Sequence, residues 1–249
     1  MANIKENIEP MTKLSVNINK IATLRNARGG NVPDLLKFAT EAQGLGADGI
    51  TIHPRPDERH IKRQDVLDLK KVVYTDFNIE GYPSDAFLEL VLQVKPEQVT
   101  LVPDAPEAIT SNAGWDVAKN SKLLKKTIDL LKKEGIASSL FLDTNLEQVR
   151  MAAEIGANRI ELYTGPYANA QNLGMSLMET LEALRLAAEE AQKLGLAVNA
   201  GHDLNLNNIK ALKHFIPFLR EVSVGQGFIA DCLYLGLPET VKKYKTCLK

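Results

Sequence analysis

Eight short, apolar, β-rich runs recur along the 249-residue chain, and each is followed by a longer segment with apolar residues three and four positions apart. Runs of the first kind are typical of buried strands, and the second spacing is the period of an α-helix. Helical patterns include residues 32–46, 121–135, 146–156 and 176–195. The predicted strands are residues 14–18, 49–53, 77–81, 98–102, 136–142, 159–163, 196–200 and 221–225.

Eight strands, each followed by a helix, in about 240 residues predict a single (β/α)8 barrel with extra helical elements. No linker or composition break divides the chain, so residues 11–249 are expected to form one domain. Residues 1–10 are expected to be a flexible extension. The alternative is an open doubly wound sheet, but the Gly-rich loop that such a sheet carries after its first strand is missing from the sequence.

Residue types also mark the predicted helix ends. Glycine, which adopts the left-handed conformation that ends a helix, precedes the next strand at Gly46, Gly135, Gly156 and Gly195. Side chains that accept hydrogen bonds from the first turn predict N-caps at Ser84, Ser121, Asn145 and Ser176.

The composition of the chain limits the classes of molecule that it is expected to bind. Its 30 Lys and Arg nearly balance 31 Asp and Glu, which argues against nucleic acid or a membrane surface as a partner. No apolar run is long enough to span a bilayer, and the first residues lack the apolar core of a signal peptide. Cys232 and Cys247 are the only cysteines and have no zinc spacing, so we expect a cytoplasmic protein without a metal site.

Polar side chains stand where predicted strands end. Catalytic groups of such barrels project from the carboxyl ends of the strands, so these residues are expected to gather at one mouth. Two carboxylates and two imidazoles there can divide acid and base duties, which predicts an enzyme. A structural salt bridge to a loop arginine is the alternative for the carboxylates. The residues concerned are Asn17, Asn19, His53, Glu80, Glu161, His202, Gly225 and Gln226.

Two basic loops follow the first two predicted strands. Residues 17–31 include Lys20, Arg25 and Arg28, and residues 53–63 include Arg55 and His60. Because arginine binds phosphate through two hydrogen bonds, basic loops at a barrel mouth predict an anionic small-molecule ligand.

Loops after later strands add candidate ligand contacts. Residues 103–120, which include Thr110, form a long segment of the kind that often acts as a lid. Gly225 and Gln226 precede the last helical region, where barrels of this kind recurrently bind phosphate at a helix N-terminus.

Several motifs together resemble the pyridoxine 5'-phosphate synthase family. They occur in order from about Val16 to the C-terminus, as VNINKIATLRNARGG, DGITIHPRPDERHI, FNIEG, LVPD, IELYTG and VNAGHDL. The resemblance implies condensation of 1-deoxy-D-xylulose 5-phosphate with 3-amino-2-oxopropyl phosphate to give pyridoxine 5'-phosphate, inorganic phosphate and water. It implies no cofactor, and it implies a homo-octamer.

The resemblance also assigns roles to individual residues. His53 and Glu80 would be general bases, His202 a proton donor, and Glu161 a stabiliser of cationic transition states. The amino-ketone phosphate would bind Asn17, Arg28, Gly225 and Gln226. The sugar phosphate would bind Arg55, His60 and Thr110, with Asn19 and Lys20 beside them.

The chain departs from the family pattern at the mouth. Asn19 and Lys20 stand where the family commonly has Asp-His, Gln226 stands in place of His, and Asp203 in place of Gly. Asp203, which is also expected to be a substrate-binding residue, therefore adds negative charge beside the predicted phosphate site. Two alternative functions remain at this point, a barrel that binds phosphorylated ligands without catalysis and another phosphosugar isomerase or aldolase.

Overall fold

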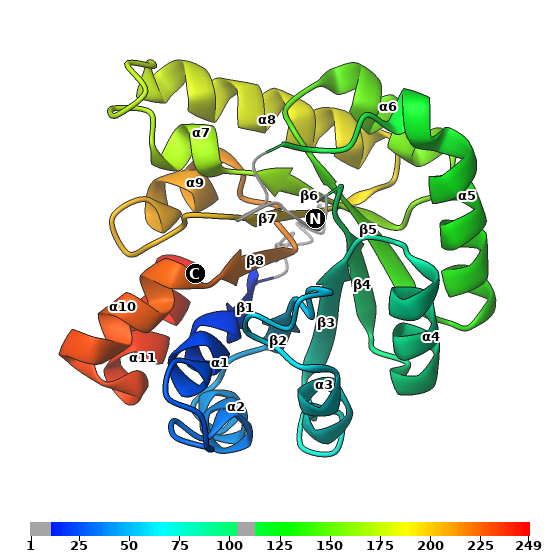
Figure 1. The fold of residues 1–249 in the computed structure, drawn as a ribbon. Coiled ribbons are helices and arrows are strands. Elements are labelled where there is room, and N and C mark those ends of the chain that lie inside the picture. Colours follow the sequence, from blue (N-terminus) through cyan, green and yellow to red (C-terminus); the bar gives the residue numbers. More distant parts are fainter. Residues whose placement is uncertain (1–10, 104–112) are drawn as a thin grey trace, which may run out of the picture.

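The computed structural model describes residues 11–103 and 113–249, and these form a closed parallel barrel (Figure 1). Each strand pairs with its neighbour in chain order, and β8 closes on β1 with Lys13 opposite Glu221. This closure confirms the predicted barrel and excludes the open sheet. The strands are β1 Lys13–Asn17, β2 Gly49–Ile52, β3 Asp76–Gly81, β4 Gln98–Leu101, β5 Ala137–Leu142, β6 Arg159–Tyr163, β7 Ala197–Gly201 and β8 Glu221–Val224.

Helices surround the barrel, and two of them rather than one follow β1, β6 and β8, which confirms the predicted extra helical elements (Figure 1). The helices of the described residues are α1 Asn19–Asn26, α2 Leu35–Gly44, α3 Arg63–Leu69, α4 Asp85–Val94, α5 Val117–Lys133, α6 Leu146–Glu154, α7 Gly165–Ala168, α8 Leu177–Lys193, α9 Ile209–Phe215, α10 Gln226–Leu235 and α11 Leu237–Cys247. The expected N-terminal extension, residues 1–10, lies outside the described part of the chain.

Three of the four predicted N-caps are confirmed, because the side chains of Ser84, Asn145 and Ser176 accept hydrogen bonds from the first turns of α4, α6 and α8. The fourth, Ser121, is wrong. Helix α5 begins one turn earlier, at Val117, and Asp116 caps it by accepting a hydrogen bond from the Lys119 amide at 3.1 Å. The four predicted C-terminal glycines all have positive φ, from 74° to 108°.

Side chains on the two faces of each strand have different partners. Residues such as Ile160 and Leu162 are fully buried in the apolar core. The alternate positions on neighbouring strands form a hydrogen-bonded polar network. In that network Thr100 donates to Asn78 at 3.0 Å, and Asn199 donates to Gln98 at 3.1 Å. These hydrogen bonds join polar side chains of different strands inside the barrel.

Charged side chains also occupy the amino ends of the strands. Lys13 and Asp76 form an ion pair at 2.5 Å, and Arg159 donates to Gln98 at 2.5 Å. Glu221, the first residue of β8, is 3% exposed. Ionisable groups are therefore not confined to the carboxyl mouth of the barrel, because strand-starting residues such as Glu221 also turn their side chains into the interior.

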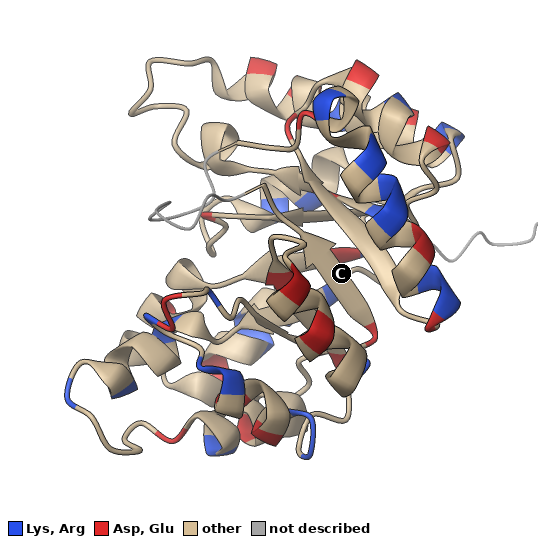
Figure 2. Ribbon diagram, turned by 45° about the vertical axis from the view of Figure 1, so that its right-hand side comes forward, with Lys and Arg blue, Asp and Glu red and all other residues tan. Residues whose placement is uncertain are grey.

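Acidic and basic residues are interspersed over the outer helices (Figure 2). Within the described ranges, no helix has the length and apolar character that crossing a membrane requires.

Candidate active site

The carboxyl ends of β1, β2 and β3 bring three predicted site residues together. His53 follows β2, and its Nδ1 lies 3.8 Å from Glu80 Oε2 near the end of β3. Asn17, the last residue of β1, donates to the same Glu80 oxygen at 3.5 Å. The side chains of His53 and Glu80 are only 8% and 13% exposed. The predicted convergence of a carboxylate and an imidazole therefore occurs in a largely enclosed place.

Asn19 fixes the backbone at this place. Its Oδ1 accepts a hydrogen bond from the His53 amide at 2.9 Å, and its own amide donates to Asn17 Oδ1 at 3.1 Å. These bonds tie the start of α1 to the exit of β2. The acceptor is an amide oxygen, so Asn at this position supplies the contact without adding a negative charge.

Two imidazoles at the β2 exit are held neutral. Burial, followed by the positive charge of Arg55, lowers the pKa of His53 well below 6.5. Burial and the charges of Arg55 and Lys20 lower the pKa of His60 to about 4. At neutral pH, His53 is thus in the form that accepts a proton. The Ile61 amide donates to His60 Nδ1 at 2.9 Å, which leaves the His60 ring proton on Nε2 as a donor.

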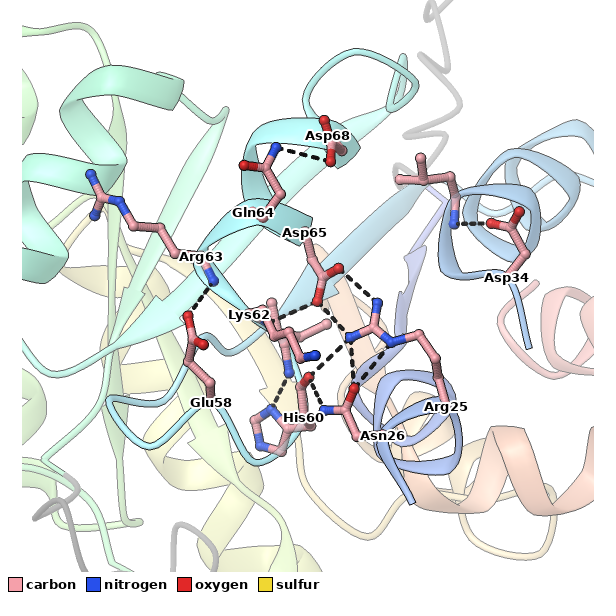
Figure 3. A network of polar contacts seen from close by, with 12 residues as sticks. Arg25, Asn26, Asp34, Glu58, His60, Lys62, Arg63, Gln64, Asp65 and Asp68 are labelled. Atoms are coloured by element: carbon pink, nitrogen blue, oxygen red, sulfur yellow. Dashed lines mark hydrogen bonds and ion pairs between the residues drawn. The ribbon is translucent and has the colours of Figure 1, made fainter. Parts of the chain in front are cut away.

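Arg25 does not belong to the anion site that its loop predicts. Its buried guanidinium donates two hydrogen bonds to Asp65, at 2.7 and 2.8 Å (Figure 3). Asn26 donates to the His60 carbonyl at 2.7 Å, and Arg25 contacts the same carbonyl at 3.4 Å (Figure 3). These contacts connect α1 with the start of α3 and fix the loop that carries His60.

The other predicted anion-binding side chains lie at different depths. Arg55 is 5% exposed, and Lys20 is exposed on the first turn of α1. Arg28 is exposed in the loop after α1 and has no polar partner among the described residues. Thr110 lies outside the described residues, as does much of the predicted lid.

Gly225 and Gln226 lie where β8 passes into α10. A Cβ added at Gly225 would lie 3.4 Å from the Asn17 Cβ, so this turn packs directly against the end of β1. Helix α10 begins at Gln226, and the first amide groups of a helix have no intrahelical acceptor. The arrangement is that of a helix N-terminus facing a barrel mouth, which favours an anion.

Glu161 lies deeper than these residues, in the middle of β6. Its Oε2 has no hydrogen-bond partner among the described residues, and a Cβ at Gly201 would lie 2.3 Å from its Oε1. Burial, and next the charge of Glu221, raise the pKa of Glu161 to about 8. Burial raises the pKa of Glu221 to about 7. In the free protein at neutral pH, Glu161 is therefore mostly protonated.

Glu221 is a partner of the site that was not predicted from the sequence. The alternation of the strand 221–225 was the available signal, because residues 221 and 223 share a face. Glu221 is in register with Asn199, which is itself in register with Glu161. The two carboxyl groups therefore belong to the same face of three neighbouring strands.

His202 and Asp203 follow β7 in the left-handed backbone conformation, with φ of 88° and 58°. The His202 Nδ1 lies 3.3 Å from Asp203 Oδ2. The His202 ring meets Tyr163, at the end of β6, edge to face with the centroids 5.1 Å apart. The second predicted imidazole is thus built into the turn between β7 and α9.

Imidazoles and carboxylates at the carboxyl ends of barrel strands, beside basic loops and a helix N-terminus, define a barrel enzyme for an anionic small molecule. The family described as pyridoxal phosphate biosynthesis protein PdxJ matches residues 14–249. The chain belongs to this family, which confirms the resemblance predicted from its motifs.

Three relatives of similar length have the same name. Proteins from Flavobacterium johnsoniae and Cytophaga hutchinsonii are each 56% identical over 96% of this chain and all of their own length. A protein from Porphyromonas gingivalis is 54% identical over 94% of this chain and 98% of its own. All three are named pyridoxine 5'-phosphate synthase.

Solved structures with low sequence identity share the fold. The thiamine phosphate pyrophosphorylase from Pyrococcus furiosus has a TM-score of 0.62 at 12% identity and covers 96% of this chain and 95% of its own. A phosphoribosylanthranilate isomerase from Thermotoga maritima has a TM-score of 0.58 at 14% identity, covering 96% and 98%. At these identities the likeness supports the barrel and nothing about the reaction.

Proposed function

We propose that the chain condenses 1-deoxy-D-xylulose 5-phosphate with 3-amino-2-oxopropyl phosphate to form pyridoxine 5'-phosphate, inorganic phosphate and water. The observation that carries the proposal is the neutral imidazole of His53 at 3.8 Å from Glu80 in the barrel mouth. Two comparisons support the proposal: the chain belongs to the PdxJ family, and relatives at 54–56% identity are named pyridoxine 5'-phosphate synthase. Residues 11–249 form the catalytic domain in this proposal.

His53 and Glu80 act as general bases, because their largely buried side chains lie 3.8 Å apart and His53 is neutral. His202 is the proton donor. Glu161 stabilises cationic intermediates. A cation bound beside Glu161 favours its ionised form, so binding reverses the effect of burial and releases a proton inside the barrel.

Two phosphorylated substrates need two anion sites. The amino-ketone phosphate binds at the α10 N-terminus through Gly225 and Gln226, with Asn17, Arg28 and Asp203. The sugar phosphate binds Arg55, the His60 Nε2–H and Thr110, with Asn19 and Lys20 at its side. Arg25 binds neither phosphate, because its guanidinium donates two hydrogen bonds to Asp65.

Mass-spectrometric detection of pyridoxine 5'-phosphate from the two purified substrates tests the reaction. We expect product from the native protein and about a 10²–10⁴-fold lower rate from Glu80→Gln, the usual contribution of a positioned base. Glu89→Gln is the matched control, since the Glu89 carboxylate lies on α4 with a side chain 75% exposed. Folded native protein that binds both substrates and forms no product contradicts the proposal and favours the non-catalytic barrel.

Borohydride treatment with substrate separates the proposal from an aldolase. A Schiff-base aldolase has a reactive lysine that borohydride traps as a stable adduct. Lys20, at the start of α1, is the lysine that would carry it. Trapping at Lys20 together with retro-aldol products would overturn the condensation mechanism.

We also propose that the protein is a cytoplasmic homo-octamer. Apolar side chains of α10 support association, because Leu233 and Tyr234 are 75% and 88% exposed beside the extra helix α11. Sedimentation velocity should give an assembly of about eight chains, and Tyr234→Lys should reduce its size. A monomer at micromolar concentration contradicts this proposal.

A further inference from the structure

The backbone of the turn after β7 is held in an uncommon conformation. His202 and Asp203 both have positive φ, which costs free energy in residues other than glycine. The Thr164 hydroxyl donates to the Gly201 carbonyl at 2.7 Å and also contacts the His202 carbonyl. Asn208 donates to the Asp203 carbonyl at 3.2 Å. These bonds maintain the conformation and turn the two neighbouring side chains toward each other.

The Asp203 carboxylate connects His202 with a second element. Asp203 Oδ2 lies 3.3 Å from His202 Nδ1 and accepts a hydrogen bond from Asn169 Nδ2 at 2.9 Å. Asn169 is the C-cap of α7 and follows its last residue, Ala168. The Asp203 oxygen that faces the imidazole is therefore also held by the Asn169 amide.

Aromatic side chains restrict the His202 ring from another direction. Tyr163 meets the ring edge to face at 5.1 Å, and Phe141 packs at 6.5 Å from it. Phe141 also contacts Tyr163 at 5.4 Å, so the two aromatic rings support each other. The imidazole is thus confined between a carboxylate and an aromatic pair.

We propose that Asp203 is a positioning residue for His202: its carboxylate holds the Nδ1 side of the imidazole, so that Nε2 on the opposite side delivers the proton. This inference rests on the proposed function, in which His202 is the proton donor. It gives Asp203 a role other than phosphate contact, and it explains how a negative charge is tolerated beside an anion site. The carboxylate stabilises the positive charge that the imidazole carries before it gives up the proton.

The surrounding charges are consistent with an ionised Asp203. The interaction with His202 is the main factor that lowers the pKa of Asp203, and Asn169 and Lys20 lower it further. Tyr163 on β6 faces the same group, and the charges of Asp203 and Asp143 help to raise its pKa. Tyr163 therefore stays neutral at neutral pH.

The test uses Asp203→Asn, because Asn tolerates positive φ and removes only the charge. We expect kcat to fall about 10- to 100-fold, part of the 10²–10⁴-fold that a positioned proton donor supplies. KM for each substrate should stay within about twofold. In a His202→Gln background, the same change should have no further effect on kcat. Asp129→Asn, on the exposed Lys125 pair of α5, is the matched control and should match the native rate.

Two results would overturn the inference. A raised KM for the amino-ketone phosphate with unchanged kcat would mean that Asp203 acts on substrate binding alone. Equal losses from Asp203→Asn in the native and His202→Gln backgrounds would mean that it acts independently of His202.

A readout without turnover separates this inference from the proposed function. Carbon-13 NMR of the Asp203 carboxyl should show its pKa rising when His202 is replaced by Gln, because the main lowering interaction is removed. If native protein makes no product, the proposed function fails while this coupling is still measured. An unchanged Asp203 titration in His202→Gln refutes the coupling itself.

Discussion

Replacing Glu161 with Gln should stabilise the protein at alkaline pH and destabilise it by about 1–3 kcal/mol at acidic pH. Glu161 is 3% exposed, and its Oε2 has no hydrogen-bond partner among the described residues. An ionised carboxylate at this position has lost its hydration and is repelled by the negative charge of Glu221. Gln has the same shape without the charge.

The pKa gives the size of the effect. Its rise from 4.5 to about 8 means that the folded protein keeps a proton that the unfolded chain releases. Below pH 4.5 the carboxyl group is protonated in both states, so it does not lower the free energy of unfolding. The free energy of unfolding then falls as pH rises, and the decrease is complete above pH 8. At about 1.4 kcal/mol for each pKa unit, the loss is about 3 kcal/mol at pH 7 and about 5 kcal/mol above pH 8.

The variant does not recover the whole of this free energy. The Gln amide needs hydrogen-bond partners, and leaving it unsatisfied costs about 1–3 kcal/mol. The Ser139 hydroxyl and the Asn199 side-chain oxygen, Oδ1, are also without partners in the described part of the chain, and Asn199 is in register with Glu161. We therefore expect the free energy of unfolding of Glu161→Gln to be about 2–4 kcal/mol higher than that of the native protein at pH 8.5.

Urea unfolding at fixed protein concentration, followed by the fluorescence of the single tryptophan, measures this difference at pH 5.5, 7.0 and 8.5. Trp115 is buried and reports loss of the fold. Glu41→Gln, at a carboxylate 53% exposed, is the control and should follow the native pH dependence. A constant difference between native protein and Glu161→Gln at all three pH values refutes the argument, because it would show that Glu161 ionises without penalty.

Two further predictions concern the exit of β2. Arg25→Met should lower the free energy of unfolding by about 3 kcal/mol, because it leaves Asp65 without its buried partner; thermal melting at pH 7 measures this, and a loss below about 1 kcal/mol contradicts it. The pKa of His53 lies well below 6.5, so His53 remains neutral as pH falls through 6.5 and kcat/KM should lose no activity from its protonation there. A plot of kcat/KM against pH for native protein and His53→Gln checks this, and an acid limb at 6.5 that vanishes with His53 would refute it.

The strands could be predicted from sequence to within one residue at each end. Strand β6 was predicted at its observed bounds, 159–163, because its outward residues Ile160 and Leu162 are apolar and short turns flank it. The start of α5 was not predicted, since Asp116 and Ser121 are both good caps one turn and more apart. The choice between them depends on the packing of the first turn, where Val117 is fully buried.

The polar interior was harder to predict. Glu80 and Glu161 were noticed because each interrupts an apolar run, whereas Glu221 was not noticed because it begins one. A strand-starting residue is exposed in some folds and interior in others, depending on the stagger of the strands. Closure of β8 on β1 places Glu221 opposite Lys13, and a single strand contains no information about that register.

The loop charges show why composition alone does not identify ligand-binding groups. Arg25 and Arg28 lie three positions apart in one basic segment of the sequence. Arg25 nevertheless forms an ion pair with Asp65, forty positions further along the chain, whereas Arg28 is exposed. Asp203 presents the opposite case, because its partner is the adjacent residue. In an extended strand, neighbouring side chains point to opposite faces, so adjacency of His202 and Asp203 would predict separation. Only the left-handed backbone at both residues turns the carboxylate toward the imidazole, and that conformation is maintained by Thr164 and other residues beyond the motif.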